Sequence, residues 1–273
     1  MEQVLATGLG CISAPGLSVN QAHEAMLEGR RSLASPKRLP LGLGREMPVF
    51  EIDSDFAAEL GAHSLDGSGW FRTNRMAVLA AKEACAQAGL DGDALRELRV
   101  GVCLGTTVGC TLNNEPFYRS YRRGELPDTR GVARYLNNNP ALLLARVLDL
   151  HGPVATVANA CASGTDAIGL GRSWLLEGRC DLVLAGGSDE LSRVTCLGFA
   201  SLMVTSEGAC RPFDRRRDGL NLGEGAGVVV LETRTGHRQR GGPPPQGVVL
   251  GYGCSTDSHH VTAPHPEGKG LER

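Results

Sequence analysis

Several features that would assign a chain to a specialised class of protein are missing from these 273 residues. Lys plus Arg (28) nearly balance Asp plus Glu (30), so the formal charge of -2 gives no global reason to expect a nucleic-acid or anionic-membrane partner. No apolar segment approaches the roughly 18 residues that a membrane-spanning helix needs. No basic stretch leads into a long apolar run after Met1, so we expect no signal peptide. We expect a soluble globular protein that meets any charged partner through a local patch.

The cysteines lack the spacing of metal ligands. There are nine, an odd number, with no CxxC and no Cys/His ligand pattern. We therefore expect reduced thiols, a cytoplasmic location and no metal site, with most cysteines acting as small buried hydrophobic residues. They are Cys11, Cys85, Cys103, Cys110, Cys161, Cys180, Cys196, Cys210 and Cys254.

Strand-like and helix-like segments alternate along the chain, which predicts an α/β layered fold. The length suits one large or two small domains, and a hydrophobic content of 41% can build a core. We predict strands over 4–8, 100–104, 154–157, 182–185, 225–231 and 247–252. We predict helices over 20–28, 73–88, 140–150 and 165–177, the first with Ser18 as a possible cap. Residues 36–55 are predicted to be irregular and residues 237–246 flexible.

The segment from Val154 to Glu177 is the most informative local arrangement. A strand-like run leads directly into Asn-Ala-Cys-Ala-Ser-Gly, and a helical pattern follows. Such a turn can present a side chain at the end of a sheet, where the unpaired amides and positive dipole end of the helix favour a thiolate. Cys161 is therefore a candidate for covalent acyl transfer, with its own amide as one oxyanion donor. On local pattern alone, Cys161 could equally be one more buried structural cysteine.

Longer segments resemble the β-ketoacyl-acyl-carrier-protein synthases, the elongating ketosynthases, along nearly the whole chain. VLATGLGCISAPG and VGVCLGTTVGC are similar to the first two strands of that family with their glycine turns. NACASGTDAIG resembles the nucleophile segment and DLVLAGGSDE the next strand. The most specific matches, CRPFDRRRDGLNLGEGAGVVVLE and YGCSTDSHHVTAPHPEG, follow in the order of the family. The resemblance implies the N-terminal half of the thiolase-like α/β fold, a mixed sheet with helices on its faces.

The resemblance also implies a decarboxylative condensation of the ping-pong type. Cys161 stands at the nucleophile position and would accept an acyl group from a carrier-protein thioester, before condensation with a carbanion made from a malonyl thioester. The substrates would be carried on the phosphopantetheine of an acyl carrier protein, and no further cofactor is implied. In the related chain-length-factor subunits this position is not Cys, so Cys161 favours an acylating subunit of fatty acid or polyketide biosynthesis.

Other positions receive roles only through the resemblance. Val108 and Phe199 match positions that border the acyl pocket, although core packing explains both equally well. The gating loop corresponds to 257–262, which would place Asp257, His260 and Thr262, together with His259, near the entrance. The alternative for the two adjacent histidines is a solvated loop.

The arginine and aspartate signature has two interpretations. Arg211, Asp214, Asp218 and Glu224 are expected to hold the glycine-rich turn 223–227 against the active-site end of the sheet. The alternative is that the arginines of this run, Arg215, Arg216 and Arg217 among them, dock an acidic carrier protein. A second group of candidates for a basic docking patch is Arg119, Arg122 and Arg123.

The sequence departs from the family in one respect. The second half of such enzymes contributes two histidines, a lysine and a glycine-rich loop that completes the oxyanion hole, and none of these motifs occurs here. We expect residues 1–253 to form the core of an N-terminal half and 254–273 to begin the connection to a second half. A lone half would expose a large apolar face, so we expect a complementary half or a second synthase subunit, in a dimer or heterotetramer. A natural split enzyme and a fragment both remain open.

Two other functions stay in view. The chain could be a non-catalytic subunit, similar to a chain-length factor or a scaffold, in which Cys161 is a relic. It could also be a thiolase-fold enzyme that acts on coenzyme A thioesters, although the RPFDRRRDG and GEGAG segments favour the carrier-protein synthases.

Overall fold

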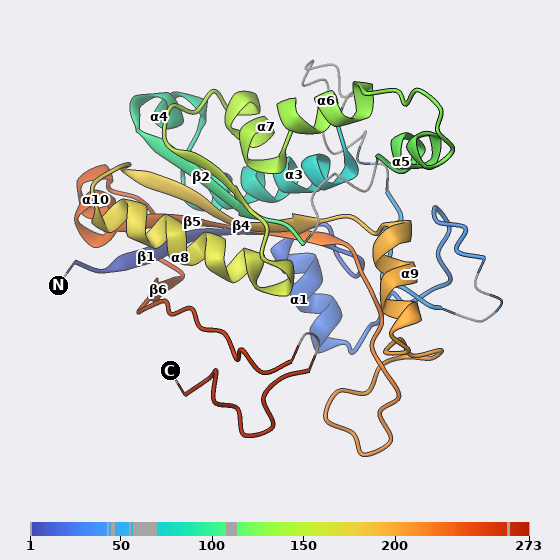
Figure 1. Cartoon of the computed structure of the whole chain (residues 1–273). Helices are drawn as coiled ribbons and strands as arrows, with labels where there is room; N and C mark the ends of the chain where they lie inside the picture. Colours follow the sequence, from blue (N-terminus) through green and yellow to red (C-terminus); the bar gives the residue numbers. More distant parts are fainter. Residues whose placement is uncertain are drawn as a thin grey trace.

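A mixed sheet of six strands, in the order β3-β2-β4-β5-β1-β6, organises the chain (Figure 1). The computed structural model describes residues 2–42, 44, 47–54, 56, 70–107, 114–260 and 263–272. β2 runs parallel to both β3 and β4, whereas β5 is antiparallel to β4 and β1, and β1 is antiparallel to β6. The strands are β1 (Val4–Ser13), β2 (Val100–Gly105), β3 (Val154–Val157), β4 (Leu182–Asp189), β5 (Gly225–Thr233) and β6 (Gly247–Val249).

Helices cover both faces of this sheet, as expected. α3 (Arg72–Gln87) and α7 (Pro140–Val147) pack on one face, and α8 (Ser163–Leu176) packs on the other, across β4 and β2 (Figure 1). The remaining helices are α1 (Val19–Leu27), α4 (Gly92–Glu97), α5 (Glu115–Arg122), α6 (Arg130–Asn137), α9 (Arg193–Ser201) and α10 (Arg234–Arg240). The structure therefore confirms the predicted layered α/β fold.

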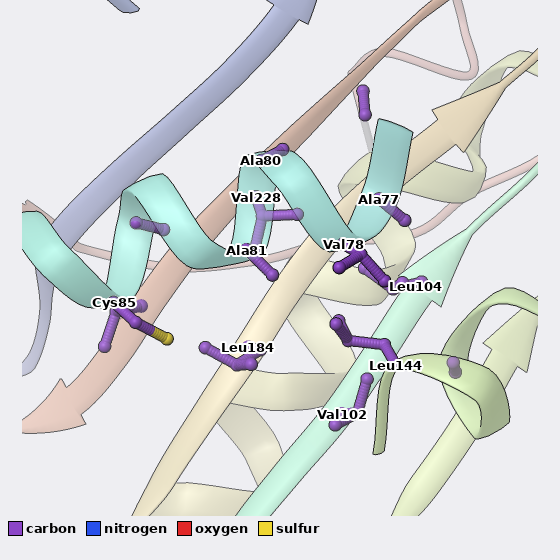
Figure 2. Packing of buried hydrophobic residues seen from close by; sticks show 14 of the residues in the cluster. Ala77, Val78, Ala80, Ala81, Cys85, Val102, Leu104, Leu144, Leu184 and Val228 are labelled. Carbon is purple, nitrogen blue, oxygen red and sulfur yellow. The ribbon is translucent and has the colours of Figure 1, made fainter. Parts of the chain in front are cut away.

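The larger core lies between α3 and the sheet. The helix turns small side chains such as Ala77, Ala80 and Ala81 toward the strands, as Figure 2 shows, and all three are fully buried. Opposite them lie branched residues of the strands, among them Leu104 and Leu184. Small residues on the helix and larger ones on the sheet interdigitate, which brings the helix close to the strands.

The predicted elements agree with the structure where local signals are strong. The helix predicted over 73–88 is α3, displaced by one residue at each end. The predicted cap Ser18 accepts a hydrogen bond from the Gln21 amide at 3.2 Å and begins α1. β1 is longer than the 4–8 predicted, because it continues through its glycines in register with β5.

Two predictions near the end of the chain are wrong. Residues 237–246 were expected to be flexible, yet α10 extends to Arg240, begins at the cap Thr233 and ends at Gly241 in the left-handed conformation. The strand expected over 247–252 comprises only Gly247–Val249, the part that pairs with β1. Helices α4, α5, α6 and α9 had not been predicted. α5 and α6 bury no residue and so carry no core-facing pattern, whereas α9 buries only Cys196 and Ala200.

The described cysteines are free thiols that range from buried to exposed, with Cys11 and Cys210 intermediate. Cys85 and Cys103 are buried, and burial raises the pKa of each thiol to about 12. Cys180 and Cys196 are buried as well, whereas Cys161 and Cys254 are exposed. The exposure of Cys161 excludes the alternative of a buried structural cysteine. In the same described part of the chain, no helix is long and apolar enough to cross a bilayer.

Candidate active site

Cys161 lies where the chain passes from β3 into α8. A single 3-10 turn, η3 (Ala160–Ala162), carries it past the carboxyl ends of the parallel strands β2, β3 and β4. A cavity of about 260 Å³ adjoins the cysteine. Its walls include Thr107, Asp189 and glycines of β4 and β5. Convergence of strand ends at one edge places these groups, which are distant in sequence, around the thiol.

The turn that presents the cysteine is held in an uncommon conformation. Ala160 has a φ of 45°, in the left-handed region that residues with a side chain rarely adopt. Ser163 braces this turn: its hydroxyl accepts from the Asn159 amide at 2.7 Å and lies within donating distance of the Ala160 (2.7 Å) and Thr106 (3.0 Å) carbonyls. The sequence analysis treated Ser163 only as a small neighbour, although its hydroxyl is buried and fully used.

Asp189 ties the end of β4 to the end of β2. Its carboxylate accepts from the Thr106 hydroxyl (2.7 Å), the Thr107 amide (2.9 Å) and the Thr107 hydroxyl (2.9 Å). This clamp fixes the wall of the cavity opposite Cys161. It was missed, and the available signal was the Asp that follows the strand LVLAGGS together with the paired threonines of GTT.

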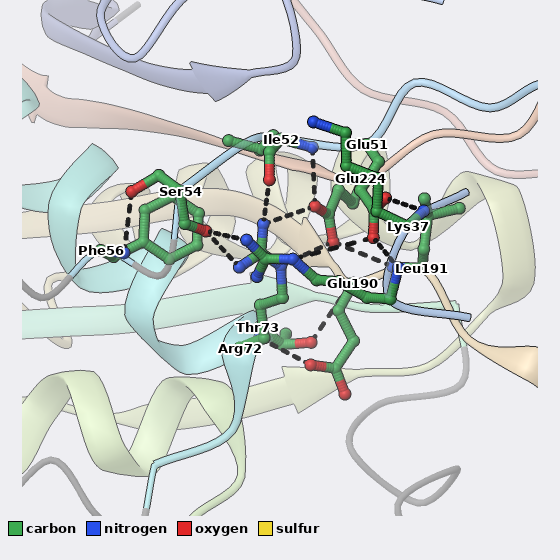
Figure 3. A network of polar contacts seen from close by, with 11 residues as sticks. Lys37, Glu51, Ile52, Ser54, Phe56, Arg72, Thr73, Glu190, Leu191 and Glu224 are labelled. Carbon is green, nitrogen blue, oxygen red and sulfur yellow. Dashed lines mark hydrogen bonds and ion pairs between the residues drawn. The ribbon is translucent and has the colours of Figure 1, made fainter. Parts of the chain in front are cut away.

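Glu224 holds the start of β5, whose glycines line the cavity (Figure 3). Its carboxylate pairs with Arg72 through two bonds of 2.6 and 2.9 Å, and accepts from the Ile52 amide at 2.9 Å. Only 2% of the Glu224 side chain and 16% of the Arg72 side chain are exposed. Glu224 thus contacts both α3 and the irregular segment around Ile52. Its partner Arg72 was not indicated by the sequence.

Arg211, Asp214 and Asp218 bond within their own loop. The Arg211 guanidinium lies 3.7 Å from Asp218, whose carboxylate also accepts from the Ser206 hydroxyl at 3.1 Å. The Asp214 carboxylate accepts from the Arg216 amide at 2.7 Å. In the described residues these side chains bond inside the loop, so holding the glycine-rich turn falls to Glu224.

The remaining predicted residues lie away from the cavity or cannot be placed. Phe199 is half-buried on α9 and is not among the cavity walls. Asp257 accepts from the His265 amide at 2.8 Å, and His260 is exposed, with its Nδ1 accepting from the Ala263 amide. Val108 and Thr262 lie outside the described residues. The candidate docking residues Arg119, Arg122 and Arg123 are exposed along α5.

The polar side chains around Cys161 bond to other groups of the protein. Asp189, Glu224 and Ser163 each have protein partners within hydrogen-bond distance. Nowhere in the described ranges do three or more His, Cys, Asp or Glu side chains gather in a way that could hold a metal ion. The arrangement presents an exposed thiol beside a helix N-terminus and a small cavity, which supports nucleophilic thiol chemistry.

Comparison with known proteins agrees with this geometry. A solved structure described as the ishigamide ketosynthase/chain length factor superposes with a TM-score of 0.89 at 30% identity, covering 99% of this chain and 68% of its own. The tetracenomycin polyketide synthase ketoacyl synthase alpha subunit of Streptomyces glaucescens is 31% identical over 98% of the chain and 66% of that protein. The 3-oxoacyl-[acyl-carrier-protein] synthase 2 of Staphylococcus aureus (strain COL) is 30% identical over the whole chain and 67% of its own length.

The fold is therefore that of the thiolase-like ketosynthases. The family described as beta-ketoacyl synthase, N-terminal domain, matches residues 1–237, and this chain belongs to it. The chain spans about two thirds of the length of the relatives that it matches.

Proposed function

We propose that this chain carries the nucleophile of a ketosynthase and accepts an acyl group on Cys161. The Cys161 sulfur would attack the thioester carbonyl of an acylated carrier protein, the carbon-sulfur bond to the phosphopantetheine would break, and the thiol proton would pass to the departing sulfur. The observation that carries the proposal is the exposed Cys161 at a braced strand-to-helix turn beside the cavity, in a member of this family.

Carbon-carbon bond formation would need groups from elsewhere. The histidine and lysine motifs that the family uses for decarboxylation are not among these 273 residues. A complementary C-terminal half or a second subunit would supply them. Large apolar side chains are exposed on the two edge strands, at the end of α8 and after β6, and a partner chain would cover them. They are Val154, Leu176, Val248 and Leu250, with exposed fractions of 39%, 41%, 41% and 85%.

The proposed acyl donor is a carrier protein. The loop from Arg211 to Asp218 exposes three consecutive arginines, and three more are exposed on α5 and directly after it, also on the side of the molecule away from α10 (Figure 1). Phe213, at 101% exposure, stands among the arginines of the loop. Positive charge around an apolar contact suits an acidic partner. The Staphylococcus aureus relative is named for an acyl carrier protein, which agrees with this donor.

Acylation of the full-length protein tests the proposal. An acyl carrier-protein thioester is incubated with the protein, and the acylated peptide is identified by mass spectrometry after digestion. We expect one acyl group on Cys161 and no acylation of Cys161→Ala. The matched control is Cys254→Ala, because Cys254 is the other exposed cysteine of the described chain and its loss should leave acylation unchanged. Label on another residue, or no label at all, would refute the proposal.

A second candidate is a non-catalytic partner subunit that sets chain length. The observation that favours it is the match to a structure that contains both a ketosynthase and a chain length factor. In that case Cys161→Ala would leave the condensation activity of the assembled complex unchanged. Under the first proposal the same variant abolishes it.

A further inference from the structure

Asp166, in the first turn of α8 after the cysteine, links two segments that are far apart in sequence. One carboxylate oxygen accepts from the Asn159 side-chain amide at 2.6 Å, and the other accepts from the Tyr252 hydroxyl at 2.7 Å. Asn159 lies two residues before Cys161, whereas Tyr252 follows β6. A single carboxylate thus joins the turn that presents the cysteine to the segment that leads into residues 257–260.

The Tyr252 contact is shaped to the helix. The tyrosine ring lies against Gly169 of α8, where an added Cβ would come within 2.3 Å of the ring atoms. This residue therefore has to be glycine for the ring to reach the helix and for the hydroxyl to reach Asp166. An incidental hydrogen bond at a surface would not need the tyrosine ring to pack this closely against the helix.

The protonation states of Asp166 and Tyr252 favour both hydrogen bonds near neutral pH. Both partners of Asp166 donate, so they hold the pKa of its carboxyl below the usual range, Asn159 most strongly. The same carboxylate raises the pKa of the Tyr252 hydroxyl. Near neutral pH the aspartate is ionised and the tyrosine is protonated, which is the combination that both hydrogen bonds need.

Asn159 is the residue through which Asp166 reaches the cysteine. Its amide donates to Ser163, its carbonyl accepts from the Ala162 amide at 3.1 Å, and its side chain donates to Asp166. These three bonds enclose the left-handed residue Ala160. An uncommon backbone conformation persists only where its surroundings hold it, and here Ser163 and Asp166 hold it from two sides.

We propose that Asp166 is a positioning residue for Cys161. Through Asn159 it fixes the turn that sets the direction of the thiol and of the nearby amides, and through Tyr252 it ties that turn to the segment after β6. The inference rests on the proposed function, because positioning matters for a thiol that attacks a carbonyl in a defined geometry. It adds that efficient acylation requires Asp166 as well as Cys161.

The test compares two reactions of the same thiol in the full-length protein. Acyl transfer from a carrier-protein thioester needs the carbonyl held against the amides of the turn, whereas alkylation by iodoacetamide, run at a pH where the thiol is ionised, needs only an accessible thiolate. Both rates at Cys161 are measured by peptide mass spectrometry, and acyl transfer is followed at several donor concentrations. The variants are Asp166→Ala, Asp166→Asn and Tyr252→Phe. Glu177→Gln, which removes an exposed carboxylate at the far end of the same helix, is the matched control.

We expect Asp166→Ala to lower the saturated acylation rate by about tenfold or more, with the half-saturating donor concentration unchanged, since small misplacements near reacting atoms have effects of this size. Alkylation should stay within about twofold of the wild type, because it does not depend on the turn geometry. Asp166→Asn should retain most of the rate, because its amide oxygen can still accept from Asn159. Tyr252→Phe should give an intermediate loss, and Glu177→Gln should give none.

Three results would overturn the inference, each with its own signature. Acylation of Asp166→Ala at the wild-type rate would show that the link does not position the cysteine. A parallel fall of acylation and alkylation would show that Asp166 only supports the fold. A wild-type protein that is alkylated but takes up no acyl group would refute the proposed function, and the inference with it.

Discussion

Gly105 marks the point where β2 comes closest to the helix that follows Cys161. A Cβ on this residue would lie 2.2 and 2.3 Å from the Ser163 carbonyl carbon and oxygen. Those are backbone atoms, so the strand and the helix would have to separate. The close approach also keeps Thr106 within reach of the Ser163 hydroxyl. The position of the thiol thus depends on a residue that has no side chain.

The first prediction compares two glycines near Cys161. Gly105→Ala should lower the free energy of unfolding by about 2 kcal/mol or more, because overpacking against backbone has no flexible atom to move aside. Gly164→Ala is the matched control: a Cβ there meets nothing within 4 Å, and the residue is helical, so stability should be unchanged or rise by up to about 1 kcal/mol. Urea denaturation of both variants measures the difference. Equal stabilities would contradict the packing argument.

The second prediction concerns Asp181 at the start of β4. Its pKa is lowered chiefly by the hydrogen bonds from the Arg99 guanidinium. A carboxyl whose pKa is lower in the folded state stabilises the fold above its unfolded pKa of about 3.9, and that contribution is lost as the pH falls through the folded value. Asp181→Asn should therefore cost less than about 1 kcal/mol at pH 7, because the pair is largely exposed.

The difference between the wild type and Asp181→Asn should shrink progressively as the pH falls from about 4 toward the lowered folded-state pKa of Asp181, because the carboxyl is protonated first in the unfolded and then in the folded state. Denaturation midpoints at pH 7 and at pH 3 measure this change. A difference that grows on acidification would contradict the assignment.

At the scale of elements, the buried pair of Arg72 and Glu224 joins three parts of the chain. Arg72 begins α3, Glu224 precedes β5, and both bond to the segment around Ile52 (Figure 3). The Arg72 guanidinium also lies 4.5 Å from the centre of the Phe56 ring. Removal of either partner would leave a buried charge without its counter-ion.

The third prediction is that Glu224→Gln and Arg72→Met each destabilise the protein by about 3 to 5 kcal/mol, whereas the double variant costs less than the sum. The exposed pair of Lys37 and Asp53, at 66% and 79% exposure, is the matched control. Lys37→Met should change stability by less than about 1 kcal/mol. Chemical denaturation of the four proteins measures these values, and strictly additive effects would show that the two side chains do not act as a pair.

Local sequence predicted an element well where one face of it packs on the core. α3 is the clearest case, because its buried alanines recur at helical spacing along one face. α5 and α6 lack buried residues, and no helix was predicted over either of them. α10 was not predicted because its segment is rich in arginine and adjoins prolines. Thr233 and Gly241 are nevertheless ordinary signals for the start and end of a helix. The prediction of a flexible segment over 237–246 rested on amino-acid composition and did not take the capping residues into account.

At the scale of the whole molecule, the net charge of -2 hides an uneven distribution. Exposed arginines lie on α5 and in the loop after α9, both on the side of the molecule away from α10, with α5 at the top and the loop at the bottom of that side in Figure 1. This side also carries the carboxyl ends of the parallel strands, where Cys161 lies. A carrier protein docked on these arginines would approach the side of the sheet that presents the thiol.

The fourth prediction is that salt weakens the binding of carrier protein before it affects acylation by a small soluble thioester, because exposed charges are screened beyond about 10 Å at 0.1 M salt. Arg215→Glu combined with Arg216→Glu should weaken carrier binding at low salt and leave acylation by the small thioester unchanged. The control is Arg238→Glu on α10, at the opposite end. Calorimetric titration measures the affinities, and equal effects of both variants would argue against a localised docking surface.

The sequence by itself determined the fold class, the order of the main strands and helices, and Cys161 as the candidate nucleophile, because periodicity, caps and contiguous motifs are local properties. The tertiary structure alone decided what holds that cysteine. Ser163 meets Thr106 from 57 residues away, Asp189 meets Thr106 across 83, Asp166 meets Tyr252 across 86, and Arg72 meets Glu224 across 152. Each of these hydrogen bonds exists because parallel strand ends and packed helices converge at one edge of the sheet, and no local pattern encodes that convergence.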